Sequence, residues 1–265
     1  RKKLFLIEHC NLGAEFKHRS KLFRLLLRSS ISILYNRVHK VITVSAGVGE
    51  DLIRKGLRRE NTKVIYNPAY PHLPKDELHY EKGKKKWFKQ DCLKISAVGH
   101  PHKQKNYPNL INAVEILKNK KEINCQVIIA GEGPENNNIK DLIYKKKLTN
   151  EISLVGSVSN ALSLIKESDL FVLSSSYEGF GMVIVEALSL GKTVVSTDCP
   201  SGPSEILGDN EFGYLCKVND PSDLAAKIDY ARKNNFNPEK LIARAKEFSV
   251  EKIGSLYAEI IVALN

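Results

Sequence analysis

Two glutamates with seven residues between them, Glu178 and Glu186, stand on either side of a glycine-containing turn. An apolar stretch before the turn predicts a buried strand, and a helix is predicted to begin near Gly181 or Met182. The N-terminus of such a helix offers free backbone amides and the positive end of the helix dipole, which together bind anions. Gly179 and Gly181 lack side chains, so a phosphate or a sugar can approach the backbone closely there.

The two carboxylates suit sugar hydroxyls. A carboxylate is a bidentate acceptor for vicinal hydroxyls such as those of ribose or a pyranose. One glutamate in the turn and one on the helix could therefore hold two different sugars joined by a diphosphate. Taken alone, the spacing favours a plainer alternative, in which Glu186 is an ordinary solvated helix residue and Glu178 a loop charge.

A basic loop follows another predicted strand. It contains His100, His102, Lys103 and Lys105, and cations at this place would neutralise a diphosphate. The alternative is a solvated lysine loop, which is what most charge runs are. A third turn, with two glycines at 131 and 133, suits close packing or ligand approach.

The elements that must position these loops alternate along the chain, which predicts a doubly wound α/β architecture. Strands are expected at 4–8, 40–44, 63–66, 93–98, 126–130, 152–155, 170–173 and 193–196. Helices are expected at 46–55, 108–118, 136–147, 161–167, 183–190, 221–233 and 251–264. Several of the strands are continuous apolar runs, which indicates a parallel sheet covered by helices on both faces.

A proline-rich and charged stretch between Pro68 and Leu93 predicts a linker between two domains. Only two or three strand–helix units precede it, too few for an independent sheet with both faces covered, and a Rossmann-sized set follows it. We therefore expect the chain to begin partway through a first domain at 1–75. A second domain is expected at 76–250, with the last helix, 251–265, packing back on the first.

Composition sets the class of protein. The chain has 265 residues, 42% of them hydrophobic, and no apolar run long enough to span a bilayer. Its five scattered cysteines form no metal-binding pair and no disulfide framework, so we expect small buried hydrophobic residues and a reducing, cytoplasmic setting.

The net charge of +11 is concentrated at the front of the chain, where residues 1–90 hold 21 Lys or Arg against 8 Asp or Glu. Such a basic segment suggests a polyanionic surface partner, such as nucleic acid or anionic lipid, or a merely solvated basic face. Nucleic acid is disfavoured because the basic residues lack interleaved aromatics and a known motif. The stretch 17–40 predicts a basic helix with an apolar stripe, which either meets a membrane or packs in the core of its own domain.

The spacing of Glu178 and Glu186 resembles the E-x7-E signature of retaining glycosyltransferases with the GT-B fold, glycosyltransferase family 4. Other segments resemble this family in the same order: Asn67-Pro68, Gly99 with Gln104-Lys-Asn106, Gly131-Glu-Gly-Pro134, Ser153-Leu-Val-Gly156, Ser176-Tyr-Glu-Gly-Phe-Gly181, Glu186-Ala-Leu-Ser-Leu-Gly191 and Cys199-Pro-Ser-Gly-Pro-Ser-Glu205. The resemblance implies two Rossmann-like parallel-sheet domains. The first of them, on the acceptor side, is expected to be incomplete in this chain.

The resemblance also implies roles for residues. Glu178 would contact the transferred sugar, Glu186 would hold the ribose hydroxyls, and Lys105 would neutralise the departing diphosphate. The family usually has arginine where this chain has His100, which is only partly charged near neutral pH. The donor-binding residues so implied are Gly99, His100, Lys103, Lys105, Gly131, Gly133, Val155, Ser157, Glu178, Gly179, Phe180, Gly181, Met182 and Glu186. His9, after the first strand, is implied to contact the donor sugar or the reacting centre, with a structural histidine as the alternative.

The expected activity is retaining transfer of a sugar from a nucleotide diphosphate sugar to a hydroxyl of a glycan or lipid-linked oligosaccharide. The segment 200–205 resembles polysaccharide-building members that use UDP-sugars. No D-x-D sequence is present, so no metal is expected to hold the diphosphate. Peripheral contact with an anionic membrane at its cytoplasmic face is a further expectation. The alternatives are a sugar-nucleotide epimerase of the same architecture and a non-catalytic fragment or subunit that binds nucleotide sugars.

Overall fold

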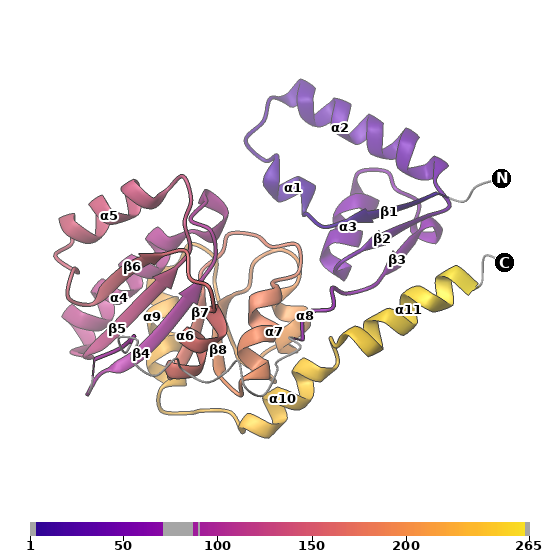
Figure 1. Ribbon diagram of the computed structural model, residues 1–265. Helices are drawn as coiled ribbons and strands as arrows, with labels where there is room; N and C mark the ends of the chain where they lie inside the picture. The colour runs from indigo at the N-terminus through magenta and orange to yellow at the C-terminus, as the bar shows by residue number, and fades with distance from the viewer. Residues whose placement is uncertain (1–3, 71–86, 90, 263–265) are drawn as a thin grey trace.

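The structure, a computed structural model, describes residues 4–70, 87–89 and 91–262 and contains two parallel β-sheets (Figure 1). A three-stranded sheet has the order β1-β2-β3, and a six-stranded sheet has the order β6-β5-β4-β7-β8-β9. Every strand pair within the two sheets is parallel. The predicted α/β fold with two parallel sheets is therefore confirmed.

The small sheet and the helices on it form the N-terminal lobe. Its strands are β1 (Phe5–Glu8), β2 (Lys40–Thr43) and β3 (Thr62–Val64). Its helices are α1 (Leu12–Glu15), α2 (Lys21–Leu34) and α3 (Ala46–Arg54). The last helix of the chain, α11 (Val250–Val262), also belongs to this lobe, because its Ile253 packs with Ile42 and Ile65 of the small sheet. Figure 1 shows α11 running back beneath this sheet.

The large sheet organises the C-terminal lobe. Its strands are β4 (Leu93–Val98), β5 (Cys125–Ala130), β6 (Ile152–Gly156), β7 (Leu170–Leu173), β8 (Thr193–Thr197) and β9 (Tyr214–Cys216). Its helices are α4 (Tyr107–Lys121), α5 (Asn136–Lys145), α6 (Ala161–Glu167), α7 (Met182–Ser189), α8 (Pro203–Leu207), α9 (Pro221–Ala231) and α10 (Pro238–Lys246). Every residue of β5 and β7 is buried, because helices cover both faces of the sheet.

The order of the large sheet reverses beside β4. From β4 the chain runs outward through β5 and β6, and it then returns to place β7 on the other side of β4. In open α/β sheets the loops at the carboxyl ends of two such strands diverge and leave a crevice, where ligands bind. The loops after β4 and β7 are the two in which the sequence placed its basic residues and its first glutamate.

Three elements of the C-terminal lobe were not predicted. The strand β9 has three residues and the helix α8 five, so neither is long enough to show a periodic pattern. The helix α10 begins after Asn237, whose side chain accepts hydrogen bonds from the amides of Glu239 and Lys240. The third strand also differs, since it covers Thr62–Val64 rather than 63–66.

The chain crosses between the lobes twice, once after β3 and once before α11, and the two crossing segments are in contact. The amides of Ala69 and Tyr70 both donate to the carbonyl of Phe248, at 3.0 and 3.1 Å. Beside this point Tyr66 stacks on Phe180, with ring centroids 5.3 Å apart, and Phe248 meets both rings edge-on. The predicted linker continues into 71–86, which lies outside the described residues, as does the expected boundary at 75 and 76.

The cysteines and the side chains of α2 differ in their exposure to solvent. Among the five cysteines, all free, Cys125, Cys199 and Cys216 are buried, as expected for small apolar residues, Cys92 is half-buried and Cys10 is exposed. The helix α2 buries Ile31 against the small sheet and exposes an opposite apolar face. Within the described ranges, no helix is both long and apolar enough to cross a bilayer.

Candidate functional site

The loops that follow β4 and β7 are tied together at the crevice. The hydroxyl of Ser174 donates to the carbonyl of Lys105 at 2.8 Å, and the amide of Ser176 donates to the carbonyl of Gln104 at 2.8 Å. From behind, Thr197 at the end of β8 donates to the carbonyl of Ser175 at 2.6 Å. The basic loop and the glutamate turn therefore form one rigid edge of the large sheet.

Glu178 lies at the centre of this edge and is only 6% exposed. One of its oxygens, Oε1, accepts from Lys105 Nζ at 2.7 Å and from the hydroxyl of Ser175 at 2.7 Å. The other, Oε2, accepts from Gln104 Nε2 at 3.3 Å. This buried carboxylate thus has a lysine and two further hydrogen-bond donors as partners. The structure thus brings Glu178 and Lys105 into direct contact.

The other cations of the basic loop lie apart from Glu178. His100 places its Nδ1 2.9 Å from the carbonyl of Glu132, so its ring is held against the loop after β5. Lys103 is exposed within the 3₁₀ turn that ends at Lys105. Asn106 closes the turn in a left-handed conformation with φ of 47°, which turns the chain into α4.

The two glycines after β5 serve close packing between loops. A Cβ on Gly131 would lie 2.1 Å from the carbonyl oxygen of Gly99, and a Cβ on Gly133 would lie 2.8 Å from that of Pro101. The amide of Gly131 also donates to Gly156 at 2.7 Å, which joins the loop after β6 to the same edge. Of the two remaining residues implied there, Val155 is half-buried at the end of β6 and Ser157 is exposed.

The helix α7 begins directly after the turn, as predicted. Gly181 precedes it with φ of 93°, a left-handed conformation that favours glycine. Met182, its first residue, is 44% exposed, whereas Ile184 and Val185 of the same turn are fully buried. One turn further along, Glu186 is half-buried, and its burial raises the pKa of the carboxyl group.

The N-terminal lobe faces this turn. His9 follows β1 and is exposed. A Cβ on Gly179 would lie only 1.8 Å from the carbonyl oxygen of His9, so the two backbones are packed closely together. Ser45 caps α3 by accepting from the amide of Val48 at 3.2 Å, and the same hydroxyl donates to the carbonyl of Gly179 at 2.7 Å. The backbone at Gly179 is therefore held between the two lobes.

Sequence reasoning missed the residues that support Glu178 and Gly179. Gln104 belongs to a motif to which the sequence assigns no role, Ser175 lies in the turn after the strand expected at 170–173, and Ser45 directly precedes the helix expected at 46–55. A hydroxyl three residues from a site carboxylate is the signal that could have found Ser175, whereas Gln104 lies 74 positions from Glu178. The role of Ser45 depends on a contact across 134 positions, which no local pattern shows.

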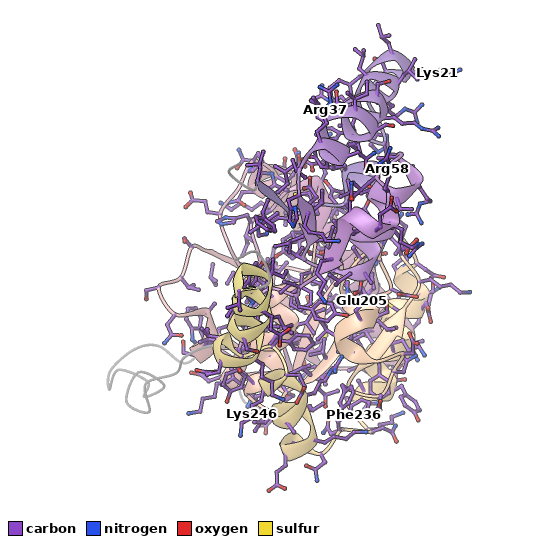
Figure 2. All side chains as sticks on the ribbon, turned by 90° about the vertical axis from the view of Figure 1, so that its right-hand side faces the viewer. Lys21, Arg37, Arg58, Glu205, Phe236 and Lys246 are labelled. Atoms are coloured by element: carbon purple, nitrogen blue, oxygen red, sulfur yellow. The ribbon has the colours of Figure 1, made fainter. Side chains whose placement is uncertain are left out.

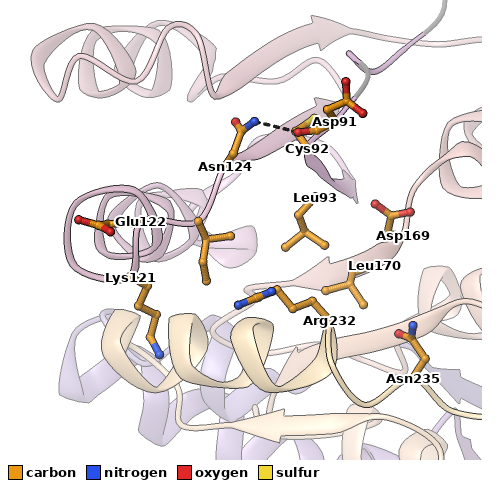
Figure 3. A pocket seen from close by; sticks show the side chains of 11 residues that line it. Asp91, Cys92, Leu93, Lys121, Glu122, Asn124, Asp169, Leu170, Arg232 and Asn235 are labelled. Atoms are coloured by element: carbon orange, nitrogen blue, oxygen red, sulfur yellow. Dashed lines mark hydrogen bonds between the residues drawn. The ribbon is translucent and has the colours of Figure 1, made fainter.

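A cavity of about 660 Å³ lies at the opposite edge of the large sheet, where β4 and β7 begin. Figure 3 shows Asp169, Arg232 and Asn235 on its wall, with Asn124 donating to the carbonyl of Asp91. It is remote from the loops that hold Glu178. Among the residues that the structure describes, no group of three or more His, Cys, Asp or Glu side chains is arranged to hold a metal ion.

Curated proteins of several organisms are similar to this chain in sequence. A protein of Campylobacter jejuni, the N-acetylgalactosamine-N,N'-diacetylbacillosaminyl-diphospho-undecaprenol 4-alpha-N-acetylgalactosaminyltransferase, is 28% identical over 262 residues, 95% of this chain and 68% of that protein. An uncharacterized glycosyltransferase of Methanocaldococcus jannaschii is 38% identical over 175 residues, 65% of this chain and 40% of that protein.

The fold is shared with a solved structure, that of Anabaena HepE in complex with UDP and glucose. It superposes with a TM-score of 0.79 at 24% identity, over 99% of this chain and 72% of that one. Together with the two parallel sheets, this likeness makes the fold GT-B. The model of the family described as glycosyl transferases group 1 matches residues 80–248, which span β4 to the end of α10 and include every loop at the crevice. The chain therefore belongs to the glycosyl transferases group 1 family.

Proposed function

We propose that the protein is a retaining, metal-independent glycosyltransferase that takes a sugar from a UDP-sugar and passes it to a hydroxyl of a lipid-linked glycan. The observation that carries the proposal is the buried Glu178, held by Lys105 and Ser175 four residues before α7, whose first residue, Met182, is exposed. An acceptor for sugar hydroxyls, a cation and free helix amides meet there within one short loop. This is the set of groups that a sugar diphosphate needs.

Each part of the donor has a partner in this arrangement. The diphosphate would lie on the first turn of α7, where the helix dipole and the free amides favour an anion. Lys105 would neutralise the charge that grows on the diphosphate as it leaves, a form of electrostatic catalysis that needs no metal ion. Glu178 would accept from hydroxyls of the transferred sugar, and Glu186 from those of the ribose.

The proposed reaction is a single displacement on one face of the sugar. A bond forms between the acceptor oxygen and the anomeric carbon while the bond from that carbon to the phosphate oxygen breaks. The proton of the acceptor hydroxyl passes to the departing phosphate, and the sugar keeps its anomeric configuration. His9, exposed at the face of the N-terminal lobe that meets the turn, would contact the donor sugar.

The choice of substrates draws on the relatives. The Anabaena structure holds UDP and glucose, and the Campylobacter protein is named for an acceptor that is a diphospho-undecaprenol glycan. Membership of a glycosyltransferase family favours transfer over the alternatives of epimerisation and of binding alone.

The first experiment is a screen of nucleotides and nucleotide sugars for thermal stabilisation, since a ligand that binds only the folded state raises its stability. The stabilising donor is then incubated with lipid-linked glycan acceptors, and the anomeric configuration of the product is read by NMR. Glu178→Ala should abolish transfer, whereas Glu259→Ala, an exposed site on α11, should leave it unchanged. Near-normal transfer by Glu178→Ala, or an inverted product, would contradict the proposal.

A lipid-linked acceptor would bring the enzyme to a membrane, and we propose that α2 makes this contact. Leu22, Leu25 and Leu26 are each about 60% exposed, and Ile33 and Leu34 are also exposed. Exposed lysines and arginines on the same helix, Lys21, Arg24 and Arg28, lie beside this apolar face. An apolar face flanked by cations has the chemistry of a helix that lies in an anionic bilayer surface. Figure 2 shows Lys21 at the outer end of the N-terminal lobe.

Sedimentation with vesicles tests the membrane contact. The protein should bind vesicles rich in phosphatidylglycerol more tightly than phosphatidylcholine vesicles. Leu22→Gln with Leu26→Gln should weaken this binding, and Tyr144→Gln, a site 79% exposed on α5, is the matched control. Equal binding by wild type and the leucine variant would contradict the proposal and leave the transferase assignment standing.

A further inference from the structure

The two lobes meet through a small polar contact beside the candidate site. From the N-terminal lobe come Asn11 and the first turn of α3, and from the C-terminal lobe come the turn after Glu178 and the segment 201–205. Asn11 Nδ2 donates to the hydroxyl of Ser201 at 2.8 Å in a buried position. Figure 2 shows Glu205 lying between the two lobes.

Two glycines in this contact leave room for the opposite lobe. A Cβ on Gly179 would stand 1.8 Å from the carbonyl oxygen of His9, and a Cβ on Gly47 would stand 2.7 Å from the Cα of Ser201. Both neighbours are backbone atoms, which cannot move aside as a flexible side chain can. The sequence predicted that Gly179 makes space for a ligand, and in this structure the N-terminal lobe fills that space.

Glu205 binds the starts of two helices at once. Its Oε2 accepts from the amide of Ala46 at 2.7 Å, and its Oε1 accepts from the amide of Gly47 at 3.0 Å. Both amides belong to the first turn of α3 in the N-terminal lobe. The same Oε1 accepts from the amide of Gly202 at 3.2 Å, which caps α8 in the C-terminal lobe. One carboxylate thus satisfies free amides, and meets the positive dipole ends, of helices from both lobes.

Glu205 also lies close to the crossing between the lobes. Burial and the neighbouring Glu205 carboxylate raise the pKa of Tyr66, whose ring stacks on Phe180. Phe180 lies between Gly179 and Gly181, so the donor turn, the crossing and the start of α3 form one contiguous set of contacts. A change in how the lobes meet therefore moves the groups of the N-terminal lobe relative to the turn that follows Glu178.

We propose that Glu205 is a positioning residue for sugar transfer, which joins the first turn of α3 to the donor turn and so holds His9 against Gly179. The inference rests on the proposed transferase function. Glu205 contacts neither donor nor acceptor in this account. It sets the distance between a donor held wholly by the C-terminal lobe and the groups of the N-terminal lobe that the transfer requires.

Two variants disturb the contact from opposite sides. In Glu205→Gln, the remaining Oε1 can still accept from Gly47 and Gly202, but an NH₂ group faces the amide of Ala46, donor against donor. In Gly47→Ala, the carboxylate and the α8 cap are intact, and the new methyl group meets the backbone of Ser201. Gly254→Ala is the matched control, because nothing lies within 4 Å of its Cβ on α11.

Three measurements are made on the full chain: transfer rate, UDP affinity by calorimetry, and hydrogen exchange of single amides. Both variants should bind UDP like wild type, because the donor groups are unchanged, and should transfer sugar about 100-fold more slowly, as expected for a displacement near 1 Å. Exchange at the Ala46 amide should rise by about tenfold in Glu205→Gln. The Gly49 amide, bonded to Ser45 within α3, should stay protected if the helix is folded.

Several results would overturn the inference. These are normal transfer by either variant, a UDP affinity that falls in step with transfer, or an Ala46 amide in wild type that exchanges as fast as one in an open loop. If wild type transfers no sugar under any condition, the transferase proposal fails, and the exchange at Ala46 still decides whether Glu205 holds the two lobes together.

Discussion

The buried ion pair of Lys105 and Glu178 allows a quantitative prediction. The side chains of Lys105 and Glu178 are 18% and 8% exposed, and their charged atoms are 2.7 Å apart. At an effective dielectric constant of about 20, the attraction at that distance is about 6 kcal/mol before the cost of desolvation. Lys105→Met removes the cation and leaves a buried carboxylate with only Ser175 and Gln104 as partners.

Removing one partner of a buried pair lowers the unfolding free energy by about 3–5 kcal/mol. Because two hydrogen bonds to Glu178 remain, we expect Lys105→Met to lose an amount near the lower end of this range, about 3 kcal/mol. A second change, Glu178→Gln, removes the stranded charge, so the double variant should regain at least half of this loss. A matched control is Lys252→Met on α11. Lys252 Nζ lies 2.6 Å from its partner, Glu247, but the two side chains are 54% and 50% exposed. An exposed pair of this kind is worth about 0–1 kcal/mol.

The assay is urea unfolding followed by circular dichroism and by the fluorescence of Trp87, the one tryptophan of the chain. Equal slopes against urea for all variants would show that they unfold in the same way. The reasoning is refuted if Lys105→Met loses less than about 1 kcal/mol, or no more than Lys252→Met, because the burial of the pair would then make no contribution to stability.

Three further predictions concern the C-terminal lobe and the cysteines. Burial raises the folded-state pKa of Glu186 above the ordinary 4.5, so the unfolding free energy falls as the pH rises from 4.5 through the raised pKa. Glu186→Gln should therefore be more stable than wild type at pH 7 but not at pH 4, as measured by urea unfolding. Gly131→Ala should lower the unfolding free energy by more than about 3 kcal/mol, because its Cβ would lie 2.1 Å from a backbone oxygen. Gly156→Ala has open space around its Cβ but a φ of 74°, so it should lower the unfolding free energy by only about 1–2 kcal/mol in the same assay. Iodoacetamide should alkylate exposed Cys10 in the native protein and reach Cys125 only on unfolding, as mass spectrometry of peptides will show.

The sequence predicted the parts of the fold that local patterns control. The stretch 161–167 was predicted as a helix, and α6 has these bounds, because Asn160 caps it and its apolar residues recur at helical spacing. The strand β5 was predicted because a run of apolar residues can be buried on both faces only between two layers of helices. The strand β9 escaped prediction because three residues beside β8 are held by pairing and not by their own pattern.

In the candidate site, too, local sequence patterns predict some features and not others. The position of Glu178 follows from a strand, a turn and a helix that are adjacent in the sequence. Its partner Lys105 lies 73 positions away, and their contact depends on β4 and β7 being neighbours in the sheet. The contacts of Glu205 are still harder to predict, because the amides it binds are 159 and 158 positions away in the other lobe. Only three-dimensional placement assigns a role to such a residue.

The state of Lys105 before a donor arrives bears on how the site would work. A free lysine side chain loses up to about 2 kcal/mol of rotamer entropy when it is fixed on a ligand. Here Glu178 already fixes Lys105, and Tyr107 and Gly99 enclose its stem, so most of that entropy is lost on folding. Cations fixed in advance stabilise a developing charge without further reorganisation, which is the condition for electrostatic catalysis. We therefore expect Lys105→Arg to be a poor replacement: its longer, planar head cannot occupy the space beside Gly99 that the lysine stem fills, although the charge is kept.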